Sequence, residues 1–121
     1  MMNMRAPILV GFVGLALVPV IGSAAAAPSS TTAATRVTVN MTDFRFALSR
    51  SSVNKGTVTF RVVNKGKVIH DFKIAGKKTP IFKTGQRGTL RVRFSRPGRY
   101  RYICTVPGHV AAGMWGSLRV R

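Results

Sequence analysis

Residues 100–118 read Y-R-Y-I-C-T-V-P-G-H-V-A-A-G-M-W-G-S-L, the stretch that says most about the fold of this chain. It begins with alternating apolar and charged residues, which is typical of a β-strand, and it leads into a second short run of this kind, Gly116–Val120. Between the two runs, Cys104, His109 and Met114 follow one another at steps of five residues. The stretch therefore predicts two strands joined by a loop that gathers three metal-ligating side chains.

The second histidine of the chain, His70, lies upstream in the run V-I-H-D-F. The chain has one cysteine and two histidines, so no thiol or imidazole is left over for a different site. One thiolate, two imidazoles and a thioether are the ligand set of a mononuclear blue-copper centre. A thioether is a poor ligand for zinc, and one thiolate is too few for an iron–sulfur cluster. We therefore expect one copper ion per chain, with the ligands His70, Cys104, His109 and Met114.

Short runs of alternating apolar and polar residues, broken by Gly, Pro and Asn, cover the chain from Arg36 onward. Such runs predict antiparallel β-structure, and no stretch has a convincing helical period. Six or seven short strands in so small a domain favour an all-β fold, either a two-sheet sandwich or a barrel. The expected strands are Arg36–Met41, continued along the edge by Phe44–Leu48, and Thr57–Val63, Val68–Ile74, Thr89–Phe94, Arg99–Cys104 and Gly116–Val120.

The alternation also predicts where two of the ligands point. Within Val68–Ile74, His70 falls on the face that carries the apolar side chains, Val68 included, so it is expected to face the core. Within Arg99–Cys104, Cys104 falls on the face of two tyrosines, opposite two arginines. A lone inward histidine is more often a core residue than a ligand. Together with an inward cysteine at a strand end and a Pro-Gly-His loop, it favours the metal site.

The segment around Cys104 and the segment V-I-H-D-F resemble those of the cupredoxins, the family of small blue (type 1) copper proteins. The resemblance covers Arg36–Arg121, and the Cys-x4-His-x4-Met spacing is most similar to that of the rusticyanin-like branch. It implies a Greek-key, two-sheet β-sandwich with the copper near one end, and one-electron transfer between Cu(II) and Cu(I). The implied equatorial ligands are His70, Cys104 and His109, with Met114 axial. Enzymes that resemble this domain need further histidines for a second copper, so no enzymatic activity is expected.

Several residues beside the predicted ligands also have predicted roles. Asp71 follows the first ligand histidine, where the family often has an amide. Its carboxylate is expected either to accept a hydrogen bond from the loop after Cys104, at Thr105, or to be a plain turn or surface carboxylate. Trp115 is expected to pack in the core or over the site, with an electron-relay role as the alternative. Small apolar residues are expected to form a collar that shields the copper or frames the exposed edge of His109, the electron port that the resemblance implies: Val106, Pro107, Val110, Ala111 and Ala112.

The N-terminus predicts export. The run M-M-N-M-R, an apolar stretch over Pro7–Ile21 and a group of small residues have the layout of a secretory signal peptide. We expect a leader at 1–26, a flexible linker at 27–35 and the cupredoxin domain at 36–121, in the periplasm or secreted. An uncleaved anchor is the alternative, although the apolar stretch is short for a span and contains Pro19. A lone cysteine in an exported domain needs an occupant, either a metal or an intermolecular disulfide.

The charge of the chain is strongly basic. Twenty Lys and Arg face two acidic residues, and loss of Arg5 with the leader leaves a net charge of +17. Such a field attracts anionic partners. We expect a monomeric electron carrier whose basic side chains steer an acidic redox protein, a cytochrome or an oxidase. The alternatives are a copper-handling protein (storage, sensing or delivery) with the same ligands, and a basic module that contacts an anionic polymer or membrane surface. Export argues against nucleic acid as a partner.

Overall fold

The computed structural model describes residues 7–8, 10–11, 13–17, 19, 22 and 34–121. Those before Ala34 have no helix or strand, and in the described part of the chain no helix is long and apolar enough to cross a membrane. The predicted cleavage region and the predicted linker as far as residue 33 lie outside the described residues. Thr35, predicted as the last linker residue, is the first residue of strand β1.

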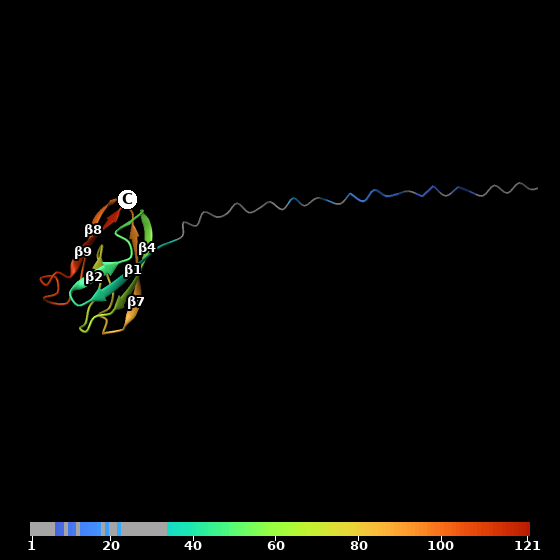
Figure 1. Cartoon of the computed structure of the whole chain (residues 1–121). Coiled ribbons are helices and arrows are strands. Elements are labelled where there is room, and N and C mark those ends of the chain that lie inside the picture. Colours follow the sequence, from blue (N-terminus) through green and yellow to red (C-terminus); the bar gives the residue numbers. More distant parts are fainter. Residues whose placement is uncertain (1–6, 9, 12, 18, 20–21, 23–33) are drawn as a thin grey trace, which may run out of the picture. The chain divides into compact units, whose positions relative to one another are not determined.

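Residues 34–121 form two β-sheets that share one core (Figure 1). In sheet A, the strand order is β2 (Arg45–Leu48), β1 (Thr35–Thr42), β4 (Gly56–Asn64) and β7 (Arg87–Phe94). In sheet B, the order is β3 (Ser52–Val53), β9 (Trp115–Val120), β8 (Gly98–Ile103), β5 (Lys73–Ile74) and β6 (Lys77–Lys78). The all-β, two-sheet sandwich expected from the sequence is confirmed.

Most strand pairs are antiparallel, as expected, but two pairs are parallel. β1 pairs parallel with β4, and β3 pairs parallel with β9. The first parallel pair arises because the chain leaves sheet A after β2 and passes through β3 in sheet B. It then returns beside β1 in the same direction, which is the kind of crossover that parallel pairing requires.

The predicted inward faces of the long strands form the core. Val37, Val39 and Met41 of β1 are fully buried, and so are Val58 and Phe60 of β4. Side chains of sheet B meet them from the other side, so apolar surface from both sheets leaves water together. Burial of each such side chain contributes about 1.5–3 kcal/mol, which makes this core the main source of the domain's stability.

The segment before β5 departs from the prediction of a continuous strand over Val68–Ile74. Only Lys73–Ile74 is a strand, and His70 forms a single bridge with Phe82. The buried side chain of Asn64 explains this, because its amide donates to the carbonyls of Val68 and Phe82, at 2.9 and 2.8 Å, and so holds both segments in place. Val68, predicted inward, is 42% exposed, whereas His70 is buried as expected.

Candidate metal centre

The loop between β8 and β9 is folded back on itself by its own backbone. The Cys104 amide donates to the Met114 carbonyl at 3.2 Å, and the Met114 amide donates to the His109 carbonyl at 2.9 Å. Gly113 takes a φ of 102°, a conformation that side-chain-bearing residues rarely adopt, so it allows the tight return toward β9. These contacts bring three residues spaced five apart in the sequence to one place.

The side chains of His70, Cys104 and His109 converge on a common point. The two histidine Nδ1 atoms lie 3.1 Å apart, and Cys104 Sγ lies 3.4 Å from His109 Nδ1 and 4.0 Å from His70 Nδ1. The three donor atoms all fall within 4.8 Å of one another. Met114, the fourth predicted ligand, is fully buried and is joined to Cys104 and His109 through its backbone. The structure thus brings together the residues that the sequence singled out.

The protonation chemistry of these side chains fits a metal ion. Burial raises the pKa of the Cys104 thiol, so without a metal the thiol keeps its proton. Burial, with a smaller electrostatic contribution from the adjacent His70, lowers the pKa of His109, which favours the neutral imidazole that a metal binds. A thiolate, two neutral imidazoles and a thioether out of contact with water are soft and borderline donors, which suit copper.

Asp43 orients the imidazole ring of His70 by a contact to Nε2, the ring nitrogen that does not face the other donors. Its Oδ1 lies 3.0 Å from His70 Nε2, and this hydrogen bond lowers the pKa of the Asp43 carboxyl. Because an ionised carboxylate can only accept, the imidazole proton must lie on Nε2. Nδ1, the nitrogen that faces the other donors, is therefore free to bind a metal. The sequence does not reveal this role of Asp43, since nothing local marks its contact with a histidine 27 residues away.

Gly66 makes room for this contact. The Asp43 carboxylate also accepts hydrogen bonds from the amides of Lys67 and Val68, which draws the segment after β4 against it. A Cβ on Gly66 would overlap Asp43 Oδ1 and would lie 2.9 Å from His70 Nε2. A side chain at this position would therefore separate the carboxylate from the imidazole.

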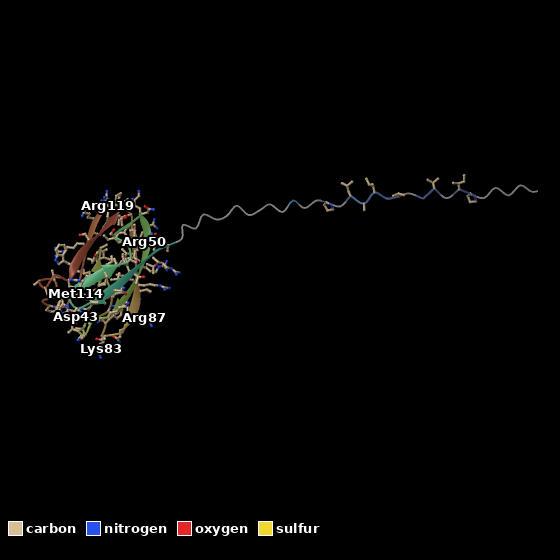
Figure 2. All side chains as sticks on the ribbon, in the orientation of Figure 1. Asp43, Arg50, Lys83, Arg87, Met114 and Arg119 are labelled. Carbon is tan, nitrogen blue, oxygen red and sulfur yellow. The ribbon has the colours of Figure 1, made fainter. Side chains whose placement is uncertain are left out.

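Phe44, the residue after Asp43, contacts the other histidine. Its ring packs edge-on against His109, with ring centroids 5.1 Å apart. Phe44 has a φ of 63°, which is uncommon for a bulky residue, and this conformation turns its side chain toward the metal loop. One turn between β1 and β2 thus supports both imidazoles. Figure 2 shows Asp43 and Met114 on the same side of the domain.

Asp71 ties the two ligand segments together, as one of the two sequence-based hypotheses expected. Its fully buried carboxylate accepts a hydrogen bond from the Thr105 amide at 2.6 Å and a second from the Thr105 hydroxyl. Lys78 Nζ approaches the same carboxylate at 3.7 Å from the exposed side. The segment of His70 is thereby fixed to the segment of Cys104.

Trp115 does not pack in the core, so that part of the expectation was wrong. Its side chain is 51% exposed, and the Arg101 guanidinium lies 4.6 Å from the ring centroid. The reason is strand parity. Leu118 and Val120 are the inward residues of β9, which leaves Trp115 on the outward face. Within the predicted collar, Pro107, Ala111 and Ala112 are exposed and Val106 and Val110 are half-buried.

A two-sheet β-sandwich that gathers one cysteine, two histidines and a methionine at one end defines a blue copper protein. Residues 12–114 match the family model of the cupredoxin-like domain. This chain therefore belongs to the cupredoxin family, and its cofactor is copper.

Two characterised relatives are similar in sequence. Auracyanin-B of Chloroflexus aurantiacus is 48% identical over 42 residues, which are 35% of this chain and 18% of that protein. Copper-resistant cuproprotein CopI of Rubrivivax gelatinosus is 29% identical over an alignment of 108 positions, and this alignment covers 70% of this chain and 66% of that protein. The chain thus spans less than a fifth of the first relative and about two thirds of the second.

Solved structures show the same fold at lower sequence identity. Reduced auracyanin from Roseiflexus castenholzii has a TM-score of 0.62 at 18% identity, over 73% of this chain and 98% of that chain. Auracyanin B has a TM-score of 0.61 at 24% identity, over 73% and 89%. An azurin from Methylomonas sp. strain J has a TM-score of 0.59 at 19% identity, over 74% and 99%.

Proposed function

We propose that this protein is an extracytoplasmic one-electron carrier, with His70, Cys104, His109 and Met114 as the ligands of one copper. The proposal depends on one observation above all, the convergence of His70 Nδ1, Cys104 Sγ and His109 Nδ1 within 4.8 Å in a buried site. Bound copper supplies the chemistry, a single electron taken up as Cu(II) becomes Cu(I) and given back in the reverse step. The site has no further thiol or imidazole for a second metal.

The surrounding residues keep the ligands in place when the charge at the site changes. The Asp43 carboxylate fixes the ring of His70, and Asp71 fixes the backbone and hydroxyl of Thr105, directly after Cys104. Because two separate segments are anchored in this way, little movement is needed between the oxidised and reduced states. Such preorganisation favours fast electron transfer over ligand exchange.

The electron is proposed to pass through the edge of His109. It is the most exposed of the four ligands, at 9%, and it lies in a loop whose exposed residues are small and apolar. Small apolar neighbours allow a partner to approach closely. The net positive charge of the chain is proposed to steer an acidic redox protein to this loop, so the association rate should fall steeply with ionic strength.

A pair of charge-matched variants tests this port. Ala111→Glu adds a carboxylate to the exposed metal loop, while Ala34→Glu adds the same charge at the start of β1. The start of β1 is about 25 Å along the strand from the turn that holds Asp43. With an acidic cytochrome as partner, Ala111→Glu is expected to slow electron transfer far more than Ala34→Glu, with both copper spectra unchanged. Equal slowing by both variants would contradict the port.

The extracytoplasmic location is supported by the predicted leader. Expression of the full chain in a bacterial host, followed by fractionation and mass determination, tests it. A periplasmic product that has lost about the first 26 residues is expected. A cytoplasmic product that still carries Arg5 would refute export.

A second function is favoured by the similarity to copper-resistant cuproprotein CopI, namely copper handling at the same site. The two functions predict different rates of copper release and of electron exchange. A carrier shows a reversible potential and fast self-exchange, and it keeps its copper against a chelator. A handling protein releases copper readily to an acceptor and exchanges electrons slowly.

A further inference from the structure

Arginine and threonine alternate over part of the outward face of sheet A, next to a row formed by Asn40, Val63 and Arg87. In the register of β1, β4 and β7, Arg36, Thr59 and Arg91 lie side by side, and in the next row Thr38, Arg61 and Thr89 lie side by side. Thr57 lies opposite Arg93 at the edge of the same face. Each arginine thus has threonine as its direct neighbour across the strands. We call this surface the Arg–Thr grid; it consists of Arg36, Thr38, Thr57, Thr59, Arg61, Thr89, Arg91 and Arg93.

Nothing within the protein neutralises this grid. The sequence has two acidic residues, Asp43 and Asp71, and in the described part of the chain their ion pairs go to His70 and Lys78. An unneutralised set of like charges on one face costs stability through self-repulsion. Alternation with threonine keeps like charges from lying directly opposite each other, an arrangement that would destabilise the sheet. By contrast, Arg99 and Arg119 of sheet B are directly opposite each other.

The shape and chemistry of the grid indicate its partner. Guanidinium groups bind phosphate oxygens with two parallel hydrogen bonds, and threonine hydroxyls can donate another. The grid extends in two dimensions over three strands, which matches a plane of anions better than a single line of them. Protein–protein interfaces are rich in aromatic residues and methionine at their centre as well as in arginine, and the grid contains no aromatic residue and no methionine.

The position of the grid leaves the metal site accessible. Outward side chains of sheet A point away from sheet B, and the loop with Cys104 and His109 connects two strands of sheet B. Figure 1 shows this loop, in red at the left of the domain, on the side away from β4 and β7. A surface bound by the grid would therefore not cover the edge of His109.

We propose that the Arg–Thr grid docks this protein onto the phosphate headgroups of an anionic membrane. The docked protein keeps its copper end free for partners in solution. The proposal does not depend on the electron-transfer function, because neither the ligands nor their supporting residues belong to the grid.

Two triple variants of equal charge test the docking. Arg36→Gln/Arg61→Gln/Arg91→Gln removes three charges from the grid, and the control Arg99→Gln/Arg101→Gln/Arg119→Gln removes three exposed charges from sheet B. The full-length chain is used throughout, so the residues before β1 are the same in every protein. Binding to vesicles of phosphatidylcholine and phosphatidylglycerol is measured by co-sedimentation, with pure phosphatidylcholine vesicles as the blank, and the copper spectrum is recorded for each variant.

The grid variant is expected to bind the anionic vesicles about 100-fold more weakly than the wild type, since each basic residue near such a surface contributes about fivefold. The control variant should lose much less, and both should keep the copper spectrum. Equal losses in the two variants would assign binding to net charge and overturn the proposal. It would also be overturned if the wild type failed to bind anionic vesicles, or if the grid bound soluble dextran sulfate but not vesicles.

Discussion

Replacement of Asp71 by alanine should show how strongly the two ligand segments depend on one buried carboxylate. The substitution removes the acceptor of the Thr105 amide, at 2.6 Å, and the acceptor of the Thr105 hydroxyl. Both donors then face a small apolar side chain at a fully buried position. The segment with His70 and the segment with Cys104 lose their only side-chain hydrogen bonds to each other in the described part of the chain, apart from those among the ligands.

The expected cost follows from the number and kind of bonds lost. A hydrogen bond to a charged group contributes about 1.5–3 kcal/mol to stability. The loss of two such bonds gives an upper limit to the loss of stability. Because the variant no longer has to bury a carboxylate, part of this loss is offset. We expect the free energy of unfolding of the metal-free protein to fall by about 3 kcal/mol, which lowers the melting temperature of a domain this size by about 12–24 °C. Copper affinity should fall about 10- to 100-fold, as for other residues that support metal ligands.

Urea titrations of metal-free wild type, Asp71→Ala and Asp71→Asn measure the effect. Asparagine keeps an oxygen for the Thr105 amide, so Asp71→Asn should cost only about 1 kcal/mol. Thr105→Val in both backgrounds completes a double-mutant cycle that isolates the contact. If Asp71→Ala changes stability by no more than about 0.5 kcal/mol, as surface substitutions do, and copper affinity is unchanged, the carboxylate does not join the segments.

Three further results are expected. Gly66→Ala places a methyl group against Asp43 and His70, so copper affinity in chelator competition should fall about 10-fold or more; an unchanged affinity would mean that the segment moves aside without cost. Burial raises the pKa of Tyr102, so at high pH the folded state keeps a proton that the unfolded state has lost. The free energy of unfolding should therefore decline as pH rises above about 10. If Tyr102→Phe shows the same decline in urea titrations, another group causes it. Because burial also raises the pKa of Cys104, copper must displace the thiol proton; calorimetry in buffers of different ionisation enthalpy should detect proton release, and affinity should weaken as pH falls, whereas a pH-independent affinity would contradict this.

Much of the fold was predictable because period-two alternation reports directly on burial. Val37, Val39 and Phe60 fall at alternate positions of long strands, and all three are fully buried. The convergence of His70, Cys104 and His109 was predictable for a different reason, since a chain with one cysteine and two histidines leaves few ways to build a metal site. The hydrogen bond between Asp71 and Thr105 could be anticipated once His70 and Cys104 were taken to lie together.

Other features depend on contacts that no local pattern reveals. β3 and β6 have two residues each, too few for a period, and they are held by pairing with β9 and β5. The irregular path around His70 follows from the buried amide of Asn64, and nothing local in the sequence marks its hydrogen bonds to Val68 and Phe82. The role of Asp43 depends on a contact across 27 residues, which exists only once the sheets are formed.

The visible spectrum of the purified protein with one equivalent of Cu(II), before and after ascorbate, tests the central claim most directly. We predict an intense blue thiolate-to-copper band that bleaches on reduction, returns on oxidation and is lost in Cys104→Ser. A colourless or weakly coloured product would contradict Cys104 as a ligand, and with it the proposed one-electron carrier.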